Sequence, residues 1–159
     1  NHLAGAMLAS QADVKLLHVP YRGSAPALAA VLAGQVPLMF DLQSTAVPNI
    51  RSGSVRAIAV TSAQRSSLLP EVPTVSESGL PGFEISAWFG IFAPAGLPAP
   101  VLDELSAAFT AIVHTPDMEK RLHNLGAEPD TRSRQAFDTY VRSQVAQYAS
   151  IVRSIGLAP

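Results

Sequence analysis

The spacing of apolar residues along the chain predicts six amphipathic helices. The longest is expected over 133–154, where apolar side chains recur every three or four residues and form one stripe. That stripe consists of Phe137, Tyr140, Val141, Val145, Tyr148 and Val152. The other five helices are expected over 2–11, 25–33, 45–52, 100–114 and 116–125.

Shorter apolar runs lie between these helices and predict five buried strands. They cover 14–20, 36–40, 55–61, 85–93 and 127–131. Runs that are apolar throughout are typical of parallel strands, because both faces of such strands are covered. Helices that alternate with strands of this kind predict an α/β fold, with a parallel or mixed sheet flanked by helices. The layout is that of the end of a larger doubly wound fold.

Small polar residues, glycine and proline mark where the helices begin and end. Ser24 is the expected N-cap of the helix over 25–33, with Pro26 in its first turn and Gly34 as its stop. Ser44 is the expected N-cap of the next helix, which Pro48 should shorten or kink. Residues 62–84 and 94–100 are rich in proline and glycine, and the second of these segments predicts a boundary between lobes.

The composition restricts the classes of partner. With 11 Lys and Arg against 12 Asp and Glu, the net charge of −1 gives no reason to expect binding to nucleic acid. Charged residues make up 14% of the chain, against roughly 25% in typical soluble domains. Together with a mean hydropathy of +0.23, this predicts that part of the surface is covered, in a homodimer or a larger assembly. The chain has no cysteine, and no apolar run approaches the roughly 20 residues that a membrane-spanning helix needs.

The strongest candidate for a binding site is the turn from Tyr21 to Ala25. It connects an expected strand to an expected helix and places Gly23 and Ser24 at the helix N-terminus. Free backbone N–H groups and about half a positive charge from the helix dipole suit this position to an anion such as a carboxylate. Arg22 would either reach a bound carboxylate or remain solvated. The alternative is an ordinary strand-to-helix turn with a serine cap.

Asp41 is the second candidate, because it follows the expected strand 36–40 at its carboxyl end. Ligand crevices of open α/β sheets form at such ends. A bare carboxylate repels an acidic ligand, so we expect Asp41 to orient water or an N–H group. The alternative is an Asx turn or an N-cap for the following helix.

The sequence offers no set of catalytic, nucleotide-binding or metal-binding residues. None of the four histidines stands at an HExxH or similar spacing, and neither a GxSxG elbow nor a GxGxxG or phosphate-binding loop is present. His18, Ser24 and Asp41 form a triad only on paper, since nothing in their spacing supports one. We therefore expect no enzyme activity, cofactor or metal, and a hydrolase remains a distant third hypothesis.

Several ordered motifs resemble one known family of receptors. These are "HVPYRGSAPAL", "GQVPLMFD", "VRAIAVTSAQRSSLLPEVPTVSESGLPGFE" and "AWFGIFAPAGLP", which begin at 18, 34, 55 and 87. The chain resembles the Bug/TctC-type extracytoplasmic solute receptors, which serve the tripartite tricarboxylate transporters of bacteria. The resemblance covers almost all of the chain and corresponds to about the C-terminal half of the family's sequence.

The resemblance implies a type II periplasmic-binding-protein architecture, with two α/β lobes around a cleft, here incomplete. Residues 1–84 would belong to the second, ligand-binding lobe, and 85–159 would supply a crossing strand and helices that return to the first lobe. The ligand would be a small mono-, di- or tricarboxylate, held mainly by backbone N–H groups and water. The site residues carried over by position are Tyr21, Arg22, Gly23, Ser24, Ala25 and Asp41.

The resemblance also implies a periplasmic location and a meeting with membrane subunits of the transporter. Two hypotheses arise for this chain. It is a receptor, or a fragment of one, that captures a small carboxylate. The alternative is a truncated receptor that acts only as a self-associating structural module and binds no solute.

Overall fold

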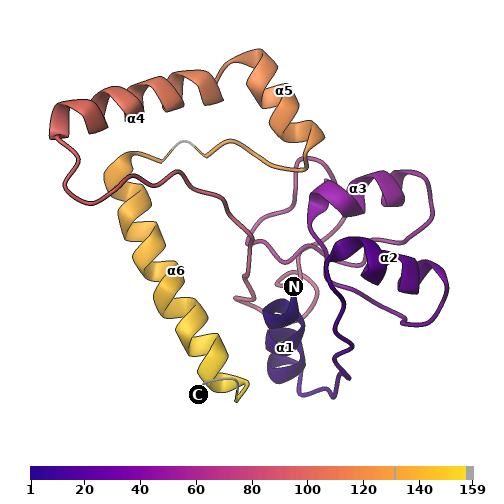
Figure 1. Cartoon of the computed structure of the whole chain (residues 1–159). Coiled ribbons are helices and arrows are strands. Elements are labelled where there is room, and N and C mark those ends of the chain that lie inside the picture. The colour runs from indigo at the N-terminus through magenta and orange to yellow at the C-terminus, as the bar shows by residue number, and fades with distance from the viewer. Residues whose placement is uncertain (131, 157–159) are drawn as a thin grey trace.

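A computed structural model describes residues 1–130 and 132–156 of the chain (Figure 1). The described residues form six helices, and each lies where the apolar spacing predicts one. They are α1 (His2–Gln11), α2 (Ser24–Leu32), α3 (Gln43–Arg51), α4 (Ala99–Val113), α5 (Pro116–Asn124) and α6 (Arg134–Ser154). None of them is long and apolar enough to cross a membrane.

The start of α2 differs from the expectation. Gly23, with φ of 109°, occupies the N-cap position, and Ser24 is the first helical residue. The prediction that Ser24 caps this helix was therefore wrong, because glycine takes a backbone conformation there that a serine adopts only with strain. Gly34 follows α2 with φ of 69°, which confirms it as the stop.

Helix α3 also begins earlier than expected and continues past its proline. Its N-cap is Leu42, so neither Ser44 nor Asp41 caps it, and Pro48 lies within the helix. Proline in this place leaves one helical hydrogen bond unmade. Thr45 Oγ1 and Asn49 Nδ2 add side-chain bonds to the backbone of this helix, to Leu42 O (3.1 Å) and Thr45 O (2.8 Å).

The expected strands are not formed as a sheet within residues 1–130 and 132–156. One isolated parallel bridge joins Val60 to Thr74, with Val60 N donating to Pro73 O and Val75 N to Val60 O, both at 2.9 Å. Parallel strands are stable only where neighbouring strands take up the backbone hydrogen bonds along their edges. The described residues provide no such neighbours for 14–20, 36–40 and 85–93, which leaves these runs outside any ladder. Residue 131, the last of the expected strand 127–131, lies outside the described residues.

The core joins the two ends of the chain. Ala4 and Met7 of α1 lie with Ile151 of α6 around Phe83, whose side chain is 1% exposed. Val75 and Ile85 complete this buried cluster. Ile85 N donates to Thr61 O at 2.9 Å, so the segment that carries Phe83 is also anchored to the middle of the chain. The first and last helices thus pack together although they are far apart in sequence.

A turn at 74–78 is held by reciprocal hydrogen bonds of the kind found at helix starts. Glu77 N donates to Thr74 Oγ1 (3.0 Å), and Thr74 N donates to Glu77 Oε2 (2.7 Å). Arg65 adds a salt bridge to the same carboxylate, with Nε 3.0 Å from Oε2. The hydrogen bond from Arg65, followed by the one from Thr74, lowers the pKa of Glu77 below its ordinary value.

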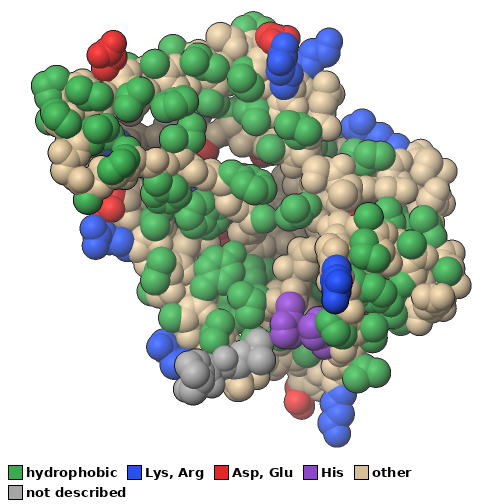
Figure 2. Space-filling model, in the orientation of Figure 1, with side chains coloured by type: hydrophobic (Ala, Val, Ile, Leu, Met, Phe, Trp, Pro, Cys, Tyr) green, Lys and Arg blue, Asp and Glu red, His purple; other side chains and the backbone are tan. Residues whose placement is uncertain are grey.

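Helices α4 and α5 form an arm that extends from the remainder of the molecule (Figure 1). Helix α4 contains no buried residue and packs mainly against α5. A salt bridge from Arg134 Nη1 to Asp103 Oδ1 (2.6 Å) links it to the start of α6. Figure 2 shows hydrophobic side chains gathered over α4 and over the chain that runs beneath it.

Candidate functional site

The candidate site is the mouth of α2. At a helix start the backbone N–H groups of the N-cap and of the first three helical residues have no partner within the helix. Here these are Gly23, Ser24 and Ala25, because the fourth residue, Pro26, carries no N–H. No side chain in the described parts of the chain caps this helix, and Gly23 and Ala25 are exposed. Three donors therefore remain available beside the positive end of the helix dipole.

Asp41 links this mouth to the start of the next helix. Ser24 Oγ donates to Asp41 Oδ1 and Thr45 Oγ1 donates to Asp41 Oδ2, both at 2.5 Å. Ser24 is the first residue of α2 and Thr45 the third of α3, so one carboxylate bridges the first turns of two helices. The structure thus brings together two of the residues that the sequence selected and adds Thr45, which it did not. The only sequence signal for Thr45 is its position four residues after Asp41, at the expected start of a helix.

These bonds fix which hydroxyl groups still have a proton to donate. A hydroxyl has one O–H donor and two acceptor lone pairs. Ser24 and Thr45 direct their protons to Asp41, and therefore offer acceptor lone pairs to anything that lies beside them. The backbone N–H groups of Gly23, Ser24 and Ala25 are donors. The mouth of α2 consequently has a donor side, suited to a carboxylate, and an acceptor side, suited to a hydroxyl, an amine or a protonated acid.

Tyr21 and Arg22 lie on the chain that leads into this turn. The Tyr21 side chain is 37% exposed, and Arg22 is exposed as well. Arg22 makes no ion pair with any residue in the described ranges 1–130 and 132–156. Its guanidinium is therefore available to solvent and adds positive charge near the helix mouth.

His18 lies near the N-terminus of α1 and is exposed. Its ring stacks on that of His2, the first residue of α1, with centroids 3.9 Å apart and planes 5° apart. Of its two expected environments, the buried core is wrong. Ser24 donates to Asp41 and His18 stacks on His2, so the paper triad gains no support from these contacts. No group of three or more potential metal ligands occurs among the described residues.

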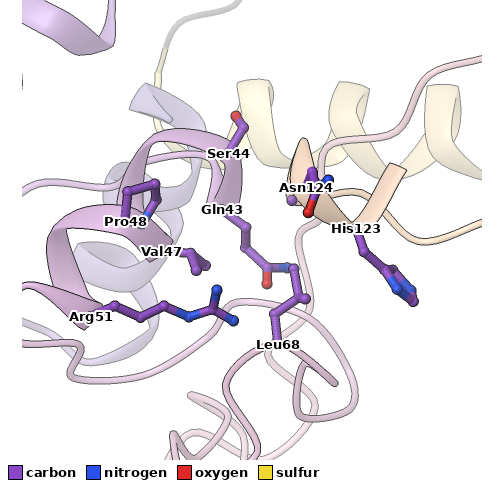
Figure 3. Close-up of a pocket in the computed structure, with 9 residues that line it drawn as sticks. Gln43, Ser44, Val47, Pro48, Arg51, Leu68, His123 and Asn124 are labelled. Atoms are coloured by element: carbon purple, nitrogen blue, oxygen red, sulfur yellow. The ribbon is translucent and has the colours of Figure 1, made fainter. Parts of the chain in front are cut away.

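A second cavity lies between α3 and α5 (Figure 3). Its volume is about 270 Å³, and polar residues dominate the walls, which include Gln43, Ser44 and Asn124. Arg51 extends toward Gln43 and Leu68, whereas the ring of His123 points away from them. The sequence analysis selected none of these residues, because a cavity between distant helices leaves no local pattern.

Gly126 explains how closely α5 approaches α3 beside this cavity. A Cβ atom on Gly126 would overlap the backbone N of Ser44, and its φ of 68° is already unfavourable for other residues. Nearby, Ser67 donates to Glu128 Oε1 through its backbone N (3.2 Å) and its Oγ (2.6 Å). The chain after α5 is thereby fastened to the segments that surround the start of α3.

Comparison with known proteins identifies the family. A model of the "Tripartite tricarboxylate transporter family receptor" matches residues 1–157. The chain belongs to this receptor family. A relative from Pseudomonas sp. strain P51, described only by its place in the tcbD–tcbE intergenic region, is 41% identical over 152 residues, which are 95% of this chain and 45% of the relative. A relative from Pseudomonas knackmussii is 36% identical, over 95% of this chain and 90% of its own length.

Solved structures give the same assignment. A Rhodopseudomonas palustris protein with adipate is 32% identical, with a TM-score of 0.84, over 98% of this chain and 52% of that protein. The periplasmic binding protein BugD is 41% identical, with a TM-score of 0.80, over 98% and 52%. MatC from Rhodopseudomonas palustris, with bound malate, is 35% identical, with a TM-score of 0.77, over 95% and 52%. The chain thus spans about half the length of these three structures and of the relative from strain P51.

These comparisons confirm the Bug/TctC resemblance and the periplasmic-binding-protein fold of the TctC type. They also decide between a receptor and an enzyme, because the family and its solved members are solute-binding receptors. The six predicted site residues remain a prediction.

Proposed function

We propose that the chain acts as an extracytoplasmic solute-binding receptor that captures a small carboxylate for a tripartite tricarboxylate-type transporter. Membership of the receptor family supports this proposal, as do related structures that hold adipate and malate. Because the chain spans about half of those structures, the binding activity is inferred from its own residues. No observation favours the alternative of a structural module without a solute.

The observation that carries the proposal is the uncapped mouth of α2 beside Asp41. Three free N–H donors and the helix dipole favour a carboxylate there, and the dipole alone contributes about 0.3–1 kcal/mol. Ser24 and Thr45 give their protons to Asp41, so their lone pairs favour a ligand group that donates. We propose a ligand with a carboxylate and, beside it, a hydroxyl, amine or protonated acid group. The solute contacts are assigned to Gly23, Ser24 and Ala25, with Asp41 as the orienting group and Tyr21 and Arg22 at the rim.

The same proposal assigns residues 1–84 to the ligand-binding lobe and residues 85–159 to a crossing segment and the return to the other lobe. It places the receptor in the periplasm, where it would meet the membrane subunits of the transporter. The description of the related BugD as a periplasmic binding protein supports that location.

Isothermal titration with malate, adipate and citrate tests this function directly. Gly23→Val should reduce the affinity for the bound acid at least tenfold, since a side chain at φ of 109° both strains the turn and covers the N–H groups. Gly34→Val is the matched control, because it strains the other end of α2 at φ of 69° and leaves the mouth free. Absence of binding to all three acids, or equal loss in both variants, would overturn the proposal.

A further inference from the structure

Residues 86–93 form an extended segment that is apolar on both sides. On one side, Trp88 and Phe92 contact Phe137 of α6, with ring centroids 5.9 and 5.7 Å apart. Gly90 lies between them, and a Cβ atom there would overlap Phe137 Cζ, so this side fits closely against the helix. On the other side, Phe89 is 85% exposed and Ile91 is 66% exposed. This alternation is that of a strand with one face covered and the other bare.

The backbone of the same segment is unpaired. The last backbone hydrogen bond before it is the one from Ile85 N to Thr61 O. Side chains of α6 reach only its beginning, where Gln147 Nε2 donates to Glu84 O (2.8 Å) and Tyr148 Oη to Ser86 O (3.0 Å). Within the described parts of the chain, residues 87–93 make no backbone hydrogen bond. Both edges of this apolar strand are therefore open to pairing.

The surface continues onto α4 and carries no charge along the chain. Residues 85–102 include no Asp, Glu, Lys or Arg. Helix α4 adds a stripe of exposed apolar side chains from Val101, Leu105, Phe109 and Ile112. We call residues 86–93 together with this stripe the strand surface. An uncharged strand with two open edges and one bare apolar face has the chemistry of an interior strand of a sheet that is covered on both sides.

The occupant of such a surface must supply strands at the edges and an apolar layer over Phe89 and Ile91. One copy of this chain, related by a twofold axis, would offer its own segment to a single edge and leave the second edge open. The related structures match this chain over 52% of their length with TM-scores up to 0.84, so nearly half of each lies outside the match. We infer that the strand surface binds a β-strand-bearing polypeptide equivalent to that remaining half of a receptor of this family. The inference rests on the unpaired strand and family membership, not on solute binding.

The test uses the 159-residue chain and the part of the Pseudomonas sp. P51 relative that this chain does not match. Light scattering after size-exclusion chromatography should detect a 1:1 complex without any added acid. Hydrogen exchange should slow at least about tenfold at the amides of 87–93, because hydrogen-bonded strand amides exchange only after opening. A missing complex, or a complex that leaves these amides unprotected, would overturn the inference. A self-dimer that protects 87–93 and excludes the added polypeptide would instead identify a second copy as the occupant and overturn it too.

Two substitutions of matched exposure locate the contact. Ile91→Lys adds a charge to the bare face and should weaken the complex at least tenfold. Val145→Lys changes a side chain on α6 that is 65% exposed, against 66% for Ile91, and should leave the complex unchanged. Equal effects of the two variants would contradict the assignment of the strand surface. Because no acid is present, this result is independent of whether the mouth of α2 binds a solute.

Discussion

At the scale of single residues, Asp41 connects two helix starts and has a measurable role in stability. Asp41→Ala removes the acceptor of both the Ser24 and Thr45 hydroxyl groups, which are part-buried. Hydrogen bonds to a charged group contribute about 1.5–3 kcal/mol each, and relaxation of both hydroxyls toward water recovers part of that. We expect the free energy of unfolding to fall by about 2 kcal/mol in urea denaturation. A loss below about 0.5 kcal/mol, the scale of an ordinary surface substitution, would show that the bridge is not formed.

A double-mutant cycle with Ser24→Ala is the control for this prediction. If the two side chains interact, the double variant should lose less stability than the sum of the single variants. Ser54→Ala supplies a matched serine whose hydroxyl bonds only to Ser52 at 2.9 Å, on the exposed side of the next turn. Its effect should add to that of Asp41→Ala without coupling.

The same residues show how far sequence could specify the site. Gly23, Ser24 and Asp41 were selected because of their places relative to helix and strand ends, and the Ser24–Asp41 hydrogen bond brings two of them together. The exact role of Ser24 was wrong, since the N-cap depends on a φ angle that sequence alone does not give. Thr45 was missed because its bond to Asp41 depends on where α3 begins, two residues before the expected start. Residue choice thus followed from local pattern, whereas the pairing of donors and acceptors required coordinates.

At the scale of elements, the turn at 74–78 should give the chain a dependence of stability on pH. The Glu77 carboxylate accepts from Arg65 and from Thr74 N, and these bonds lower its pKa below the ordinary value of 4.5. A carboxyl group with a lowered pKa stabilises the folded state above its unfolded pKa, and the contribution disappears as the pH falls through the folded value. We expect Glu77→Gln to reduce the pH dependence of stability below about pH 4.5, measured by urea denaturation across pH 3–7.

Glu84→Gln is the control for that measurement, because Glu84 is exposed and its carboxylate is not part of the turn. The two variants remove the same charge from neighbouring parts of the chain. If both change the pH profile equally, the effect comes from net charge, and the turn does not contribute it.

Helices and strands differed in how well sequence predicted them, for a physical reason. A helix satisfies its own backbone hydrogen bonds, so apolar spacing and flanking glycines sufficed to place all six within a few residues. A strand needs a neighbour, and the apolar run at 85–93 indicated burial without showing where its neighbours lie. In the described residues this run is extended, packs one face on α6 and remains unpaired. The pattern therefore predicted the environment of the segment and not the structure that this chain forms alone.

At the scale of the whole molecule, stability depends on a small core that joins the first and last helices. Phe83 is 1% exposed and contacts this core, which includes Met7 of α1 and Ile151 of α6. Phe83→Ala should cost about 3–5 kcal/mol, a large part of the 5–15 kcal/mol typical of a folded domain. We expect the variant to be largely unfolded at 37 °C, measured by circular dichroism on heating.

Phe89→Ala makes the same chemical change at a side chain that is 85% exposed. In the isolated chain it should change the free energy of unfolding by no more than about 0.5 kcal/mol, as surface substitutions do. In the 1:1 complex proposed for the strand surface, the same substitution removes a buried aromatic ring, and the affinity should fall by more than tenfold. A large loss of stability in the isolated chain would mean that Phe89 is already covered there. The contrast between the two phenylalanines therefore separates the residues that fold this chain from those that bind its partner.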